Sequence, residues 1–130
     1  MILVDTSVLI SLIKGDTAPK TEQLRQLAAS GVPFGISDHT VLEVLAGARG
    51  ETEFETLRTY LASQRIYSLP SSGYQEAARI YLRLRRAGFT PRGQIDLVIA
   101  QTAIHHSLAL LHNDRDFDVI ARHTPELAIA

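Results

Sequence analysis

Short runs of apolar residues alternate along the chain with longer segments of helical periodicity, and this alternation constrains the fold more than any other feature. The runs lie at residues 2–4, 32–36, 66–69, 108–111 and 127–129. Most of them are continuously apolar, which indicates strands buried on both faces, as in parallel sheets covered by helices. The sequence therefore predicts an α/β fold of three layers, α/β/α, around a central, mostly parallel sheet of four or five strands.

The segments between the runs carry helix start and stop residues. Capping residues stand at Asp5-Thr6-Ser7 and Ser37-Asp38, and glycines follow helical segments at positions 15, 31 and 88. The first predicted helix runs from its cap through Leu12 or Ile13. The others lie at residues 21–30, 38–48, 51–62, 73–87, 94–106 and 115–121. With 130 residues, no repeat and no linker, the chain is expected to form one domain, residues 1–130.

Composition excludes several kinds of chemistry. The chain has no cysteine, which rules out disulfides, thiolate metal sites, iron–sulfur clusters and cysteine nucleophiles. No segment reaches the roughly 18–20 apolar residues needed to cross a bilayer. The apolar N-terminus lacks a preceding cationic region and contains Asp5, unlike a signal peptide. We therefore expect a cytoplasmic protein with no membrane segment.

Three aspartates are predicted at one edge of the sheet. Asp5 directly follows the first strand, Asp114 follows the fourth, and Asp96 begins the apolar helix that leads to the fourth. Ligands bind beyond the carboxyl ends of parallel strands, where the returning helices also begin. Converging carboxylates repel one another unless a cation holds them, and carboxylate oxygens suit Mg²⁺ or Mn²⁺. The pattern predicts a metal site for phosphoryl transfer or phosphodiester cleavage.

Each of these acids also has a purely structural interpretation. Asp5 and Asp96 stand where helix N-caps are common, and Asp114 lies in the turn-prone sequence Asn-Asp-Arg-Asp. Asp116 and Asp118 suit the first turn of a helix because of its dipole. The corresponding alternative function is a non-catalytic α/β interaction or regulatory module.

Two other classes of α/β protein that gather acids at a sheet edge fit less well. A phospho-acceptor receiver domain needs a lysine after a late strand, but no lysine occurs after Lys20. A phosphatase of the haloacid dehalogenase type needs a second acid two residues after the first, where this chain has Ser7.

Four segments in order along the chain carry a family resemblance. They are Met1-Ile-Leu-Val-Asp5-Thr-Ser, Val41-Leu-Glu43-Val-Leu-Ala-Gly47, Ile95-Asp96-Leu-Val-Ile-Ala100 and His112-Asn-Asp114-Arg-Asp116-Phe117. Together they resemble the PIN-domain family, and specifically the VapC toxins of bacterial VapBC toxin–antitoxin pairs. The resemblance implies an α/β/α fold and a Mg²⁺- or Mn²⁺-dependent endoribonuclease toxin that inhibits translation and growth until its antitoxin neutralises it.

The resemblance also implies a set of site residues. It assigns five acids to one cluster: Asp5, Glu43, Asp96, Asp114 and Asp116. The metal ligands that it implies are Asp5, Asp96 and Asp114, and it places Thr6 or Ser7 against a carboxylate or the metal-bound water. Helical periodicity alone places Glu43 away from the apolar side of its helix, which slightly favours solvent.

An acidic site repels RNA, so binding must come from cations elsewhere. Residues 71–95 carry five arginines against one glutamate, although a solvated helix face is an equally good interpretation. The predicted phosphate contacts are Arg83, Arg85, Arg86 and Arg92. Transfer, ribosomal and messenger RNA all remain open as substrates. The resemblance further implies a homodimer and a VapB-type antitoxin whose arm inserts an arginine among the acids.

Overall fold

The sheet is built outward from β1 (Ile2–Val4), whose three residues are all buried. β1 pairs in parallel with β2 (Phe34–Ser37) on one side and with β4 (Ala109–Leu111) on the other. β3 (Arg65–Tyr67) and β5 (Ala128–Ile129) form the two edges, so the order is β3-β2-β1-β4-β5 with every pair parallel. The computed structural model describes all of residues 1–130, and it confirms the predicted parallel sheet.

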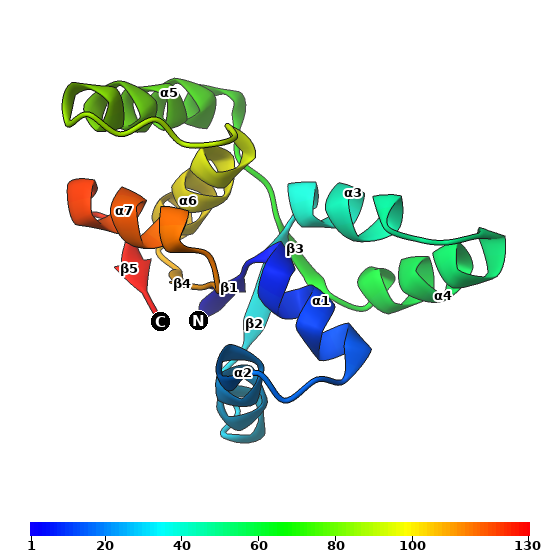
Figure 1. Cartoon of the computed structure of the whole chain (residues 1–130). Helices are drawn as coiled ribbons and strands as arrows, with labels where there is room; N and C mark the ends of the chain where they lie inside the picture. Colours follow the sequence, from blue (N-terminus) through cyan, green and yellow to red (C-terminus); the bar gives the residue numbers. More distant parts are fainter.

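Helices cover both faces of this sheet (Figure 1). In chain order they are α1 (Thr6–Lys14), α2 (Pro19–Ala29), α3 (Asp38–Ala46), α4 (Glu51–Ala62), α5 (Ser71–Arg86), α6 (Ile95–His105) and α7 (Arg115–His123). The first four pack on one face and the last three on the other, which confirms the α/β/α arrangement. No helix combines the length and the apolar character that a membrane span requires.

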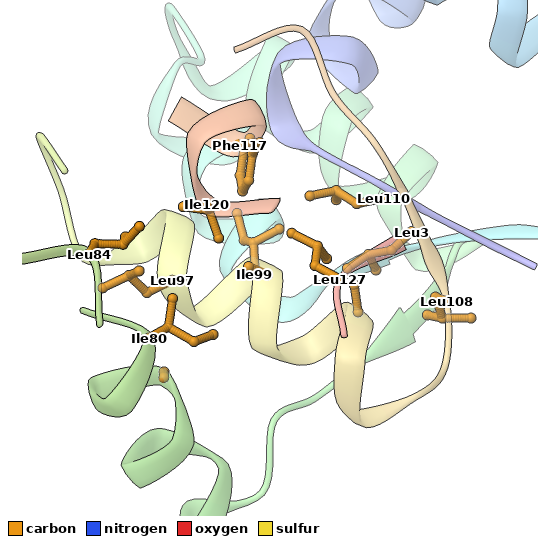
Figure 2. Packing of buried hydrophobic residues seen from close by; sticks show 13 residues of the cluster. Leu3, Ile80, Leu84, Leu97, Ile99, Leu108, Leu110, Phe117, Ile120 and Leu127 are labelled. Carbon is orange, nitrogen blue, oxygen red and sulfur yellow. The ribbon is translucent and has the colours of Figure 1, made fainter. Parts of the chain in front are cut away.

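Two hydrophobic clusters separate the layers. Successive side chains of a strand point to opposite faces, so Leu3 packs with α5–α7 whereas Ile2 and Val4 pack with α1–α4. Figure 2 shows Phe117 of α7 pointing toward Ile99 of α6, and both side chains are fully buried. This packing fixes α6 and α7 against each other and against the sheet.

Several element boundaries differ from the prediction by a few residues. α2 begins at Pro19 rather than at residue 21, because proline in the first turn of a helix sacrifices no hydrogen bond. α5 begins at Ser71, directly after Pro70, rather than at residue 73. β2 covers residues 34–37 instead of 32–36, which leaves Pro33 outside the strand. Gly15 ends α1 in the left-handed conformation, at φ 74°, as its position predicts.

The order of strands reverses between β1 and β4. The chain adds β2 and β3 on one side of β1, and then returns through α5 and α6 to place β4 on the other side. Val4 is in register with Leu111, and the Asp5 N–H donates to the Leu111 carbonyl at 2.9 Å. The residues that follow β1 and β4 therefore lie side by side at a topological switch point, where α/β sheets bind ligands.

Candidate active site

Asp5 and Asp114, which follow these two central strands, both cap a helix. Asp5 Oδ2 accepts hydrogen bonds from the Ser7 N–H and hydroxyl at 3.3 and 2.7 Å, at the start of α1. Asp114 Oδ1 accepts the Asp116 N–H at 2.9 Å, at the start of α7. The capping interpretation is therefore correct for Asp5, whereas Asp114, interpreted from the sequence as a turn residue, also caps a helix. Capping engages one oxygen of each carboxylate and leaves the other without a protein hydrogen bond.

Asp96 has no such structural task. It lies in the first turn of α6, but Gln94 occupies the N-cap position, so its interpretation as an N-cap is wrong. Its half-buried carboxylate accepts no hydrogen bond from the protein. Burial raises the pKa of Asp96 to about 7, and the charges of four other carboxylates act in the same direction: Asp5, Asp114, Asp116 and Glu43. The structure thus brings all five predicted acids together.

Three of these acids lie close enough to share one cation. Carboxylate oxygens of Asp96, Asp114 and Asp116 all lie within 4.8 Å of one another. Oxygen ligands on Mg²⁺, at about 2.1 Å from the ion, are at most about 4.2 Å apart, so small side-chain rotations would bring the trio into range. An all-carboxylate donor set fits Mg²⁺ or Mn²⁺. Asp5, predicted as a ligand, stands beside the trio and is the nearby charge that raises the pKa of Asp96 most.

Glu43 is not directed to solvent, and the expectation from periodicity is wrong. It is half-buried on α3, and its Oε1 accepts a hydrogen bond from the Thr6 hydroxyl at 2.8 Å. The hydroxyl oxygens of Thr6 and Thr40, both buried, lie 3.0 Å apart. Sequence reasoning missed Thr40, although it lies three residues before Glu43 and such spacing puts two side chains on one helix face. α3 packs against α1, so this polar face lines the site.

Arg92 is the one predicted RNA-binding arginine that reaches the carboxylates. It lies in the loop that leads into α6, and its Nε is 3.4 Å from Asp116 Oδ2. A terminal guanidinium nitrogen is 3.6 Å from Asp114 Oδ1. Its side chain is 82% exposed, so these contacts are weak and leave the guanidinium free to meet another anion.

The other three arginines belong to the last turn of α5 and lie elsewhere. Arg83 lies 3.5 Å from Glu126, beyond the C-terminal end of α7, and donates to the His123 carbonyl. Asp114 precedes the N-terminal end of α7, and a nine-residue helix spans roughly 13 Å. Arg85 lies over the Tyr81 ring. The structure therefore does not bring these arginines together with Arg92.

Residues 2–123 match the model of the PIN domain. The chain belongs to the PIN-domain family. Its curated relatives place it in the VapC group of that family. It is 33% identical to VapC ribonuclease Mb1587 of Mycobacterium bovis over 131 residues, which cover 95% of this chain and 94% of that protein. It is also 33% identical to ribonuclease VapC17 of Mycobacterium tuberculosis over 121 residues, which cover 92% of this chain and 86% of that protein.

Two solved structures share the fold at low sequence identity. VapBC2 from Rickettsia felis, bound to a promoter DNA fragment, has a chain that aligns with a TM-score of 0.78 and 20% identity, covering 100% of this chain and 98% of that one. FitAcB from Neisseria gonorrhoeae aligns with a TM-score of 0.75 and 22% identity, with 99% and 96% covered. The five-stranded sheet and its two helical layers are thus those of a PIN domain.

Crowding of the carboxylates makes the stability of the metal-free PIN domain depend on pH. The pKa of Asp96 is about 7 in the folded chain against an ordinary 3.8. Its contribution to stability is therefore fully present below pH 3.8 and is lost as pH rises through about 7. An asparagine side chain carries no charge at either pH, so Asp96→Asn is expected to raise the melting temperature in EDTA more at pH 8 than at pH 5.

Thermal unfolding of both proteins at the two pH values checks this expectation. Asp38→Asn is the matched control, because Asp38 is an exposed acid after β2, at the same edge of the sheet but outside the cluster. A stabilisation by Asp96→Asn that is equal at pH 5 and pH 8 would contradict the repulsion among the acids.

Proposed function

We propose that this PIN domain is a metal-dependent endoribonuclease that acts as the toxin of a type II toxin–antitoxin pair. The observation that carries the proposal is the gathering of five carboxylates at the switch point of the sheet, around an Asp96 that accepts no hydrogen bond. Relatives named ribonucleases support RNA as the substrate class. Solved neighbours that are toxin–antitoxin complexes support the pairing.

The trio of Asp96, Asp114 and Asp116, with Asp5 beside it, would hold Mg²⁺ or Mn²⁺. The ion would supply a water of lowered pKa and positive charge next to the scissile phosphate. Hydrolysis there would join a water oxygen to phosphorus, break the bond to the leaving oxygen and pass a proton from the water to that oxygen, which gives a phosphate monoester and a hydroxyl group. The carboxylates set the geometry of this displacement, because capping bonds and helix packing already fix their backbones.

Glu43 is suited to orient the attacking water or to accept its proton. Thr6 engages Oε1, while Oε2 accepts no protein hydrogen bond. A glutamate held at one oxygen keeps the other available in a defined position, which is what general base catalysis requires. A second ion bound at Glu43 is the other arrangement that these residues permit.

Arg92 is suited to contact RNA beside the acids. Its guanidinium offers N–H donors in a planar fork that matches phosphate oxygens. It also offsets part of the negative charge that would otherwise repel the strand. The arginines at positions 83, 85 and 86 would contact RNA farther from the cleaved bond, since they share the last turn of α5 and Arg83 contacts the C-terminal end of α7.

The alternative is a non-catalytic α/β interaction or regulatory module. Capping by Asp5 and Asp114 agrees with that alternative. Asp96 does not, because a half-buried acid with a raised pKa and no protein partner is costly in a purely structural role.

Two protein partners are proposed, a VapB-type antitoxin and a second copy of the chain. The acidic site would attract an arginine of a VapB-type antitoxin through charge-assisted hydrogen bonds, and cleavage of RNA by the free toxin would inhibit translation in the cytoplasm. Homodimerisation is supported by exposed apolar side chains on neighbouring helices. Leu42 of α3 is 63% exposed and Tyr74 of α5 is 46% exposed, and the Tyr74 hydroxyl lies 3.3 Å from His39 Nε2 of α3.

Purified protein is expected to cut cellular RNA into discrete fragments in the presence of Mn²⁺. The fragments should disappear with EDTA and with Asp96→Asn, because both treatments remove the cation from the scissile phosphate. Sequencing of the fragment ends then identifies the RNA and the cleaved bond. Cleavage that survives both treatments, or a folded and metal-bound protein that cuts no RNA, would contradict the proposal.

Loss of the Thr6 hydroxyl is expected to slow cleavage without unfolding the protein. Thr6→Val keeps the shape of the buried side chain but removes the hydrogen bond to Glu43. Such supporting contacts around metal sites are typically worth about 10- to 100-fold in activity. Thr6→Ser retains the hydroxyl and should stay near the wild-type rate, as measured by the initial rate of RNA cleavage. Equal rates for Thr6→Val and Thr6→Ser would show that the contact has no functional role.

A further inference from the structure

A polar cavity of about 480 Å³ opens beside the acidic cluster, and no hydrophobic residue lines it. Its cations come from three separate parts of the chain: Lys20 of α2, Arg92 of the loop before α6, and Arg115 of α7. Asp114 belongs to both the cavity and the cluster. The cavity is therefore continuous with the site proposed for cleavage, but cationic side chains predominate in the cavity whereas carboxylates form the cleavage site.

A buried histidine at the wall of this cavity has one ring nitrogen that makes no hydrogen bond. His112 is 3% exposed, and its Nδ1 accepts the Asp114 N–H at 3.1 Å, so the neutral ring carries its proton on Nε2. The Nε2 atom lies 3.2 Å from Asp118 Oδ1 but makes no hydrogen bond. A buried N–H that makes no hydrogen bond is available to donate to a ligand atom in the cavity.

We propose that this cavity binds a backbone phosphate of the RNA next to the phosphate that is cut. The inference rests on the proposed ribonuclease function. Arg92 connects the two sites, because it contacts Asp114 and Asp116 and also lines the cavity. The guanidinium of Arg115, the ammonium of Lys20 and the Nε2–H of His112 all donate hydrogen bonds, as a phosphate group requires.

The charge of the cavity favours a phosphate over other ligands. Three cationic side chains line it against the two carboxylates of Asp114 and Asp118, and a cation held by Asp114 would make it more positive. Arg115 is the first residue of α7, so the positive end of that helix dipole adds to its own charge. A strand that enters the acidic site has a phosphate on either side of the cleaved bond, and this cavity is the adjoining cationic space.

The test uses a short RNA that spans a cleavage position mapped in cellular RNA. Lys20→Gln and Arg115→Gln are each expected to raise KM about tenfold, the usual effect of losing one charged hydrogen bond, with little change in kcat. The salt dependence of log KM should weaken by about 0.7 per lost phosphate contact. Lys14→Gln and Arg122→Gln are the matched controls. Lys14 lies on α1 and Arg122 on α7, and neither lines the cavity.

A scan of the RNA with single uncharged methylphosphonate linkages identifies the bound phosphate. One linkage beside the cleaved bond is expected to raise the KM of the wild-type protein about tenfold, but to have no further effect in Arg115→Gln. If the effect of every linkage on KM simply added to that of Arg115→Gln, the inference would be overturned. The Arg115 charge and the charge of the replaced phosphate would then not interact with each other.

The possible failures are distinguishable. A wild-type protein that cuts no RNA overturns the proposed function and this inference together. A wild-type protein that cuts RNA, with cavity variants that behave like the two controls, overturns the phosphate site alone. Variants that cut RNA normally but no longer bind the antitoxin overturn it in favour of an acidic protein segment in the cavity. Circular dichroism and melting temperature verify that each variant is folded.

Discussion

The mutual repulsion of five carboxylates is the constraint on which the rest of this PIN domain depends. Three of the acids are held by hydrogen bonds: Asp5 and Asp114 cap helices, and Glu43 accepts the Thr6 hydroxyl. Asp116 has only a weak contact with the exposed Arg92. Asp96 has only the packing of its helix. Unpaired acids at such separations are unfavourable in the folded state, so the fold must be stable enough to hold them in place.

That stability comes from two hydrophobic clusters, one on each face of the parallel sheet. Fully buried Phe117 of α7 and Ile99 of α6 pack in one cluster with Leu3 of β1, which fixes these two acid-bearing helices on the sheet. The strand order then determines where the acids meet, because the chain reverses between β1 and β4 and leaves the ends of these strands side by side. Packing and strand order together bring residues that are far apart in the chain into one site, which lies next to a cationic cavity.

The sequence predicts the features that depend on local pattern and topology. Apolar runs predict the strands, and their parallel arrangement places Asp5, Asp96 and Asp114 at one edge. The sequence does not predict features that depend on how two helices pack against each other. The helical periodicity of α3 cannot show that Glu43 contacts Thr6 of α1. Arg83 and Arg92 are close in the sequence, but this closeness does not bring their side chains together in the fold. Lys20 reaches the cavity from α2, and nothing in its local sequence indicates this. The resemblance to VapC toxins adds Glu43 to the cluster, which the residues alone left open.

Calorimetric titration with Mn²⁺ near neutral pH tests whether the crowded carboxylates form a site for one or more divalent cations. We expect saturable binding to the wild-type protein and affinity at least about tenfold weaker for Asp96→Asn. Affinity should be unchanged for Asp38→Asn, whose acid lies at the same edge outside the cluster. Absence of binding to the folded wild-type protein, or equal affinity in all three, would contradict such a site.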